Sequence, residues 1–87
     1  MDLKYRSKTD IVASILESAN GNWVIQTKVI YNAFLSHRQL KEYIPFLVEN
    51  SLLEYNPDNQ TYKTTKKGMK LITLYNKMKE YVKELED

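Results

Sequence analysis

Hydrophobic side chains recur every three or four residues over much of the chain, which is the period of one face of an α-helix. The first such stretch has Ser7 or Thr9 as its N-cap, ends at the Asn-Gly-Asn of 20–22, and turns inward Ile11, Val12, Ile15, Leu16 and Ala19. A second stretch is capped by Thr27, reaches about Phe34, and turns inward Val29, Ile30 and Ala33 or Phe34. The pattern therefore predicts two amphipathic helices before residue 36.

A third helix is predicted by a capping box, in which Ser36 caps the first turn and Gln39 bonds back to it. Asn50 is a suitable C-terminal cap, and the buried stripe between the caps consists of Leu40, Tyr43, Ile44, Leu47 and Val48. Pro45 lies inside this pattern, where a proline costs about 3 kcal/mol in a regular helix. Because the stripe keeps its phase across Pro45, we expect a kink near residues 41–45 and no break.

Short β-prone segments separate and follow these helices. Residues 23–25 predict a short edge strand, and residues 52–55 and 61–64 predict a β-hairpin around the turn Asn56-Pro57-Asp58-Asn59. A last helix, capped by Thr64 or Thr65, runs from about Lys66 to Glu86. This order predicts a mainly α fold with a small β-hairpin, namely a winged helix-turn-helix domain (residues 1–67) followed by a long C-terminal dimerisation helix (68–87).

The last helix carries hydrophobic positions that extend beyond the reach of a small domain. They are spaced three and four residues apart, as in the heptads of a coiled coil, and comprise Gly68, Leu71, Tyr75, Met78, Val82 and Leu85. Met69 and Ile72 lie to one side of this seam, where they can pack on the domain itself. Because an exposed apolar stripe marks an interface, we expect a homodimer joined through Leu71, Tyr75, Met78, Val82 and Leu85. The alternative is a helix that folds back along its own domain.

Charge is distributed unevenly along a chain whose formal net charge is only +2. Residues 60–79 hold six lysines and no acidic residue, whereas residues 80–87 hold one lysine and four acidic residues. A basic block of this kind attracts phosphates. If two last helices pair in antiparallel fashion, Glu80, Glu84 and Glu86 of one chain approach the lysines of the other, so this sense is favoured.

The composition narrows the possible functions. The sequence has no cysteine and a single histidine, His37, so neither a thiolate nor a histidine-cluster metal site is available. It has no Ser/His/Asp combination and no glycine-rich phosphate loop, so we expect neither an enzyme nor a bound cofactor. No stretch approaches the roughly 20 apolar residues of a membrane span, and the N-terminus lacks a signal-peptide pattern. These observations predict a cytoplasmic protein with no metal and no membrane partner.

Four segments taken together resemble a known family. They are residues 28–36 (KVIYNAFLS), 39–43 (QLKEY), 47–53 (LVENSLL) and 62–68 (YKTTKKG). In order and spacing they are similar to the archaeal winged helix-turn-helix family of ten-kilodalton Sulfolobus DNA-binding proteins, which are described as predicted transcriptional regulators. The resemblance spans residues 8–80 and implies duplex DNA binding by a dimer whose C-terminal helices form an antiparallel coiled coil. Ser51 stands where such families often place glycine.

In a helix-turn-helix, the opening turn of the second helix contacts base edges. We therefore expect His37, Arg38 and Gln39 to face DNA. Arg38 is suited to guanine, Gln39 to adenine (unless the cap retains it), and Lys41 to a phosphate. Further contacts are expected from the preceding helix, the hairpin and the start of the last helix, at Lys28, Asn59, Lys63, Lys66 and Lys67. Lys4, Arg6 and Lys8 form either a basic arm against the DNA backbone or a frayed polar terminus.

The sequence thus predicts a homodimer that binds double-stranded DNA, as a transcriptional regulator or nucleoid-type protein. Its third helix is expected in the major groove, and its hairpin on the backbone or in the minor groove. A different class is a winged helix that serves protein assembly without DNA, because a fold alone does not fix a function. The seven tyrosines also raise single-stranded nucleic acid as a ligand, but most of them fall on positions predicted to face inward.

Overall fold

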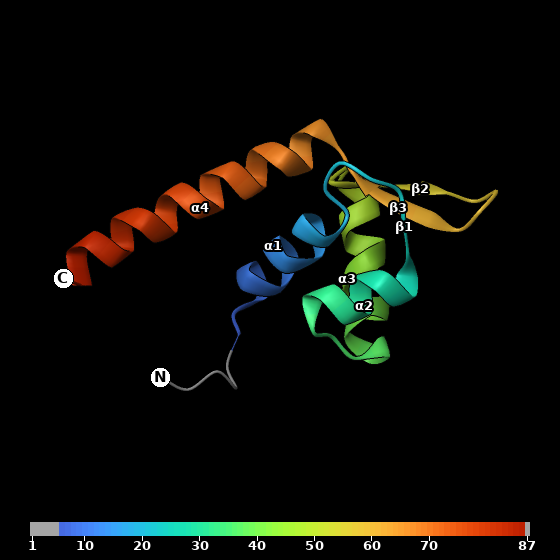
Figure 1. Cartoon of the computed structure of the whole chain (residues 1–87), viewed down its shortest axis with the longest axis horizontal. Coiled ribbons are helices and arrows are strands. Elements are labelled where there is room, and N and C mark those ends of the chain that lie inside the picture. The colour runs from blue at the N-terminus through green and yellow to red at the C-terminus, as the bar shows by residue number, and fades with distance from the viewer. Residues whose placement is uncertain (1–5, 87) are drawn as a thin grey trace.

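A computed structural model describes residues 6–86 of the chain. Four helices and three short strands follow one another in the predicted order (Figure 1). They are α1 (Lys8–Ser18), β1 (Val24–Ile25), α2 (Gln26–Ala33), α3 (His37–Glu49), β2 (Leu53–Asn56), β3 (Thr61–Thr64) and α4 (Lys66–Glu86). The molecule is elongated, with a longest extent of 48 Å, because α4 projects beyond the other elements. The predicted mainly α fold with a small hairpin is confirmed.

The strands form one antiparallel sheet in the order β1-β3-β2. Within the hairpin Tyr55 lies opposite Tyr62, and on the other side of β3 Tyr62 lies opposite Val24. Side chains that lie opposite one another share a face of a sheet, and alternate residues share it too. One face therefore carries these three residues together with the buried Leu53 and Thr64, and it packs on the helices. On the other face Ile25 and Glu54 are exposed, Lys63 is half-buried and Thr61 is buried.

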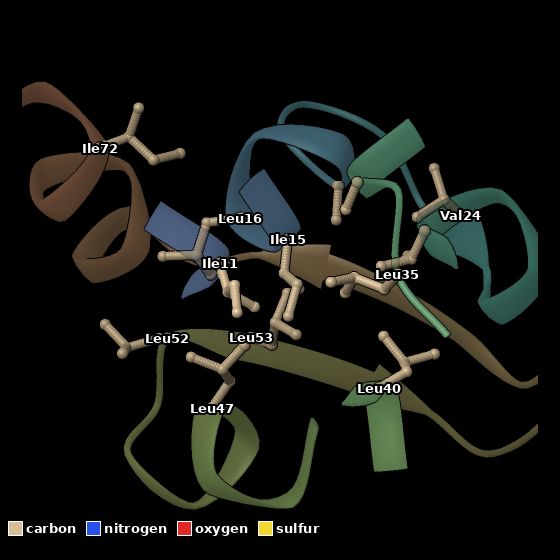
Figure 2. Close-up of a cluster of buried hydrophobic side chains, with 13 residues drawn as sticks. Ile11, Ile15, Leu16, Val24, Leu35, Leu40, Leu47, Leu52, Leu53 and Ile72 are labelled. Atoms are coloured by element: carbon tan, nitrogen blue, oxygen red, sulfur yellow. The ribbon is translucent and has the colours of Figure 1, made fainter. Parts of the chain in front are cut away.

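Side chains from all four helices and from the strands meet in one hydrophobic core (Figure 2). Its centre is fully buried and consists of Ile15, Leu16, Val29, Leu40, Leu47 and Leu53. The predicted stripes on α1 and α3 supply most of it, with Tyr43, Ile44 and Val48 partly buried at its margin. Thr64 joins β3 to the end of α1, since its Oγ1 donates to the Leu16 carbonyl at 2.6 Å.

The helix starts follow the predicted caps in three of four cases. Ser7 and Asp10 form a capping box at α1, and Ser36 and Gln39 form one at α3. At α4, the Thr65 hydroxyl accepts from the Gly68 N–H at 3.0 Å. The N–H groups at a helix start lack intrahelical partners, which is why these local side chains fix the boundaries. Asn50 caps α3 as predicted, and its N–H donates to the carbonyl of Phe46.

The start of α2 differs from the prediction, whereas its end at Ala33, with Phe34 as the C-cap, is close to the predicted one. Thr27 does not cap it, because α2 begins one residue earlier at Gln26 and makes no side-chain cap hydrogen bond. Of the two residues that could turn inward at the end of α2, Ala33 does so and Phe34 does not. Phe34 closes α2 in the left-handed conformation (φ 55°, ψ 49°), which directs its side chain outward with 86% of it exposed. Val29 and Ala33 supply the buried face, and both were among the residues predicted to turn inward.

Two features of α3 concern residues that stood out in the sequence. The helix continues through Pro45 without a break, as predicted, and Pro45 itself is exposed. Immediately after the helix, Ser51 adopts a positive φ of 61°. Glycine is favoured at such positions because it has no Cβ, so Ser51 takes a backbone conformation that side-chain-bearing residues adopt less readily.

The first half of α4 belongs to the core of the domain. Gly68 and Ile72 are buried, and Leu71 packs against the core from its margin. Gly68 allows a close backbone approach, since an added Cβ would overlap the Leu52 carbonyl oxygen and lie 2.7 Å from Thr64 Cγ2. The expectation that Met69 packs on the domain is wrong, because 44% of it is exposed. α4 runs beside α1 in the opposite direction and extends past the start of α1 (Figure 1).

Candidate nucleic-acid interface

The opening turn of α3 presents a basic, solvent-exposed surface. His37, Arg38 and Lys41 are all exposed, whereas the buried stripe of the helix faces the opposite way. Gln39 differs from the expected base contact because its Oε1 accepts from the Ser36 N–H at 3.1 Å. The capping box therefore holds this carboxamide, and the side chain is half-buried. Three of the four residues predicted on this helix remain available to a ligand.

A groove of about 400 Å³ separates this turn from the hairpin. It opens between the starts of α2 and α3 and the tip of the hairpin, and its lining includes Thr27, His37, Tyr55, Asn59 and Gln60. The groove brings together His37 and Asn59, which were predicted from the sequence as separate contacts. Thr27 and Tyr55 were missed, although the two-residue period of the strands was available to place Tyr55 on this face.

Two tyrosines form the floor between the groove and α3. The rings of Tyr55 and Tyr62 lie with their centroids 4.9 Å apart. Burial, followed by the proximity of Tyr55, raises the pKa of Tyr62 above its ordinary value, so this phenol stays neutral at physiological pH. A smaller cavity of about 170 Å³ continues from Tyr62 along α3 past Lys41 and Pro45. The groove and this smaller cavity share Gln26 and Tyr62 in their linings, and Lys41 lines the smaller one.

Lys63 lies on the other face of the hairpin. Its partner across the hairpin is Glu54, and its Nζ lies 5.8 Å from the centre of the Trp23 ring. Because successive side chains of a strand point to opposite faces, Lys63 and Tyr62 point away from each other. Lys63 therefore does not join His37 in the groove, and any contact it makes with DNA comes from the outer face of the hairpin.

The lysines at the start of α4 are far from the opening turn of α3. The Lys67 ammonium donates to the carbonyl of Asn50 at 2.9 Å, at the C-terminal end of that helix. A cation is favourable there because helix C-termini carry partial negative charge. Lys66 is exposed beside it, and Lys28 is exposed on α2. The predicted basic residues therefore lie at separate sites on the surface and do not form one continuous basic patch.

Arg6 holds the helix-turn-helix together instead of serving as a basic arm. Its Nη1 donates to the Ala33 carbonyl at 2.8 Å, and its Nη2 donates to Ser14 Oγ at 2.6 Å. The guanidinium thus caps the C-terminus of α2 and ties it to α1. Lys8 is exposed as the first residue of α1, and Lys4 lies outside the described residues.

The outer half of α4 exposes a stripe of large hydrophobic side chains. The exposed fractions are 64% for Leu74, 54% for Met78, 64% for Tyr81, 47% for Val82 and 86% for Leu85. Leu71 and Tyr75, which were predicted in the seam, lie against α1 and are half-buried. Leu74 was missed, because the spacing alone did not show which side of the helix the domain covers. We call the five exposed residues the α4 stripe, namely Leu74, Met78, Tyr81, Val82 and Leu85.

Tyr75 connects α4 to the start of α1. Its hydroxyl donates to Oδ1 of Asp10, whose Oδ2 accepts from the Ser7 N–H at 3.1 Å. Burial and the bond to Asp10 raise the pKa of Tyr75 to about 12. The bond from Tyr75, together with those from Ser7, lowers the pKa of the Asp10 carboxyl. At neutral pH this is a hydrogen bond from a neutral phenol to a carboxylate, which is stronger than one between neutral groups.

The fold and this surface together define the class of protein. Two helices joined by a tight turn, followed by a hairpin that packs beside the second, make a winged helix-turn-helix, and the family model described as "Winged helix-turn-helix" matches residues 5–83. The chain therefore belongs to the winged helix-turn-helix family.

A solved structure gives a more particular likeness. The chain is similar to the crystal structure of Sso10a-2, a DNA-binding protein from Sulfolobus solfataricus, with a TM-score of 0.79 and 26% identity. The match covers 92% of this chain and 85% of that one. The family resemblance read from the sequence is confirmed. No curated protein sequence matches the chain.

Two further findings concern the described residues alone. None of their helices is both long and apolar enough to cross a membrane. Within residues 6–86, no three His, Asp or Glu side chains gather in a way that would hold a metal ion.

Proposed function

We propose that this protein binds double-stranded DNA as a homodimer, with α3 in the major groove and the hairpin against the backbone or minor groove. The observation that carries the proposal is the exposed turn of His37, Arg38 and Lys41 beside a groove that leads to the hairpin tip. Membership of the winged helix-turn-helix family and the likeness to a DNA-binding protein support it. The role that fits is a transcriptional regulator or a nucleoid-type protein.

Each exposed group around the groove has a chemical use on duplex DNA. Arg38 has the planar fork that pairs with guanine, and Lys41 supplies a point charge for a phosphate. At the start of α2, the described residues offer no side-chain cap. Its first N–H groups beside Thr27 are therefore available to a phosphate oxygen, which helix N-termini attract. Asn59 and Gln60 at the hairpin tip add donors and acceptors for the backbone.

Dimerisation through the α4 stripe completes the proposal, with residues 68–87 as the dimerisation helix. Five large hydrophobic side chains in contact with water favour burial against a second copy. An antiparallel pair sets Glu80 and Glu84 of one chain near Lys77 and Lys79 of the other, whereas a parallel pair sets like charges side by side. The antiparallel sense is therefore the one we propose.

A salt titration tests DNA binding. A labelled 24-base-pair duplex of mixed sequence is titrated with the protein between 50 and 300 mM salt, with the single strand of equal length as control. We expect the logarithm of the association constant to fall linearly with the logarithm of salt concentration, with a slope of about −0.9 per phosphate contacted. Absence of duplex binding near 50 mM salt would overturn the proposal and favour the alternative, a protein-interaction module. Tighter binding to the single strand would also contradict it.

A further inference from the structure

The described hydrogen bonds and buried contacts that join α4 to the domain lie at its start and within its first ten residues, while Asn76 and Lys79 line a cavity shared with α1. Thr65 Oγ1 donates to the Ser51 carbonyl at 2.7 Å, Gly68 meets the Leu52 backbone, and Ile72 is buried in the core. Beyond these, the Tyr75 hydroxyl bonds to Asp10. From Lys77 to Leu85 every residue of α4 is exposed. Tyr75 therefore makes the outermost of the described hydrogen bonds that join α4 to the rest of the domain.

The position of the Asp10–Tyr75 hydrogen bond along α4 allows it to control the direction of the outer half of this helix. An α-helix rises 1.5 Å per residue, so Tyr75 lies about 10 Å along the axis from Gly68, and Glu84 lies about 24 Å along it. If α4 pivots about Gly68, a displacement of about 1.5 Å at Tyr75 becomes about 3.5 Å at Glu84. Small changes at the Asp10–Tyr75 contact are thus amplified where the α4 stripe meets its partner.

The acceptor is itself held in place. Asp10 is the third residue of α1 and forms the capping box with Ser7. Its Oδ2 accepts from the Ser7 N–H, which leaves Oδ1 for Tyr75. The ring of Tyr75 is held as well, with the Lys79 ammonium 5.2 Å from its centre. The bond therefore joins α1 to α4 through two side chains that are each held by a further contact. Hydrophobic packing at Ile72 is non-directional by comparison.

We infer that Asp10 and Tyr75 are positioning residues that set the direction of the outer half of α4, and thereby the separation of the two DNA-binding domains in the homodimer. The second part rests on the proposed function, because it requires a dimer through the α4 stripe. The first part concerns a single chain and stands independently of it. Tyr75 acts here through Asp10 and α4, and has no contact with DNA in the proposal.

Distances between spin labels test both parts. The sequence has no cysteine, so Asn22→Cys and Glu84→Cys provide two labels on exposed sites of one chain. Dilution with unlabelled protein isolates the distance within the chain. Asn22→Cys alone reports the distance between the two domains of a dimer. The distance within the chain and the distance between the domains are each measured in the parent protein, in Tyr75→Phe and in Asp10→Asn. Tyr31→Phe, which removes a hydroxyl from an 80% exposed tyrosine on α2, is the matched control.

We expect Tyr75→Phe and Asp10→Asn to shift or broaden the distance within the chain by about 3 Å, while Tyr31→Phe matches the parent. The distance between domains should change in the same two variants. Val24→Ala, a core change remote from α4, should lower the melting temperature without altering either distance, which separates positioning from general stability. Unchanged distances in Tyr75→Phe would overturn the inference. A parent that sediments as a monomer would overturn its second part and the proposed dimer, while the distance within the chain still decides the first part.

Discussion

The ammonium of Lys63 lies 5.8 Å from the centre of the Trp23 ring, on the face of the hairpin turned away from α3. Trp23 is the single tryptophan of the sequence, so its emission reports on this face alone. A cation over an indole ring contributes about 0.5–1 kcal/mol at an exposed site. The pair therefore gives the outer face of the hairpin both a modest stabilisation and a built-in spectroscopic probe.

Lys63→Met should alter the emission of Trp23 in the absence of DNA, because it removes the charge and keeps the aliphatic stem. If the hairpin contacts a phosphate through Lys63, the same change should reduce the salt slope of duplex binding by about 1. Fluorescence and the salt titration measure the two effects. An unchanged spectrum would contradict the cation–π contact, and an unchanged slope would place Lys63 away from DNA.

Lys41→Met should weaken binding to the mixed-sequence duplex and lower the salt slope by about 1, since Lys41 lies on the exposed face of α3. Lys70→Met is the matched control, because Lys70 is exposed on α4 and is assigned no DNA contact. Fluorescence anisotropy at several salt concentrations measures both. Equal losses in the two variants would show that net charge, and not the α3 surface, determines the affinity.

Met78→Lys combined with Val82→Lys should convert the dimer to a monomer, because two charges would enter the α4 stripe at the centre of the proposed interface. Sedimentation equilibrium measures the mass. Thr73→Lys adds a charge on another side of α4, outside the stripe, and should leave the mass unchanged. A doubly substituted protein that still sediments as a dimer would exclude this surface as the interface.

Gly68→Ala should destabilise the fold by about 1–3 kcal/mol, although alanine is the better helix former by about 1 kcal/mol. The added Cβ meets the Leu52 carbonyl and the Thr64 methyl, and backbone must move to admit it. Urea denaturation followed by circular dichroism measures the free energy of unfolding. Lys70→Ala, at an exposed site on the same helix, should change it little. A stabilised Gly68→Ala would contradict the close approach of α4 to the hairpin base.

Alkaline pH should weaken the fold through Tyr75, whose pKa is raised to about 12 by burial and by its bond to Asp10. Between pH 10 and 12 the unfolded chain releases this proton and the native chain keeps it, so stability falls as pH rises through this window. Tyr75→Phe should lose that component when denaturation midpoints are compared at pH 8, 10 and 11. At the acid end the sign is opposite, because the lowered pKa of Asp10 adds stability that is lost as pH falls through it.

Local patterns were sufficient to predict most of the fold. Three of the signals are each contained within four residues, namely the capping boxes at Ser7 and Ser36 and the turn before Gln60. Helices α1 and α3 begin after these capping boxes, and the turn separates β2 from β3. Near the end of α2, periodicity allowed either Ala33 or Phe34 to turn inward, and the structure has Ala33 buried. α2 ends at Ala33, and the left-handed backbone conformation of Phe34 turns the Phe34 side chain outward.

The candidate site was less predictable, because it depends on contacts between distant residues. Nothing near Arg6 in the sequence indicates that its partner is Ala33, and nothing near Lys67 indicates Asn50. These bonds give both cations structural partners that the local sequence does not reveal. On α4, the three-and-four spacing included Met78, Val82 and Leu85, which are exposed, and Leu71 and Tyr75, which are half-buried. It omitted the exposed Leu74 and Tyr81, since only packing against α1 decides which side stays exposed.

The bonds of Arg6 also carry a practical consequence for anyone preparing this protein. The residue precedes the first helix, where a designer seeking a minimal domain would trim. A chain shortened to begin at Ser7 would retain every helix and strand, yet the carbonyls that end α2 would lose their cationic partner. The link between the end of α2 and α1 would then be lost, so Arg6 belongs to the folded helix-turn-helix unit and should be kept in any truncation.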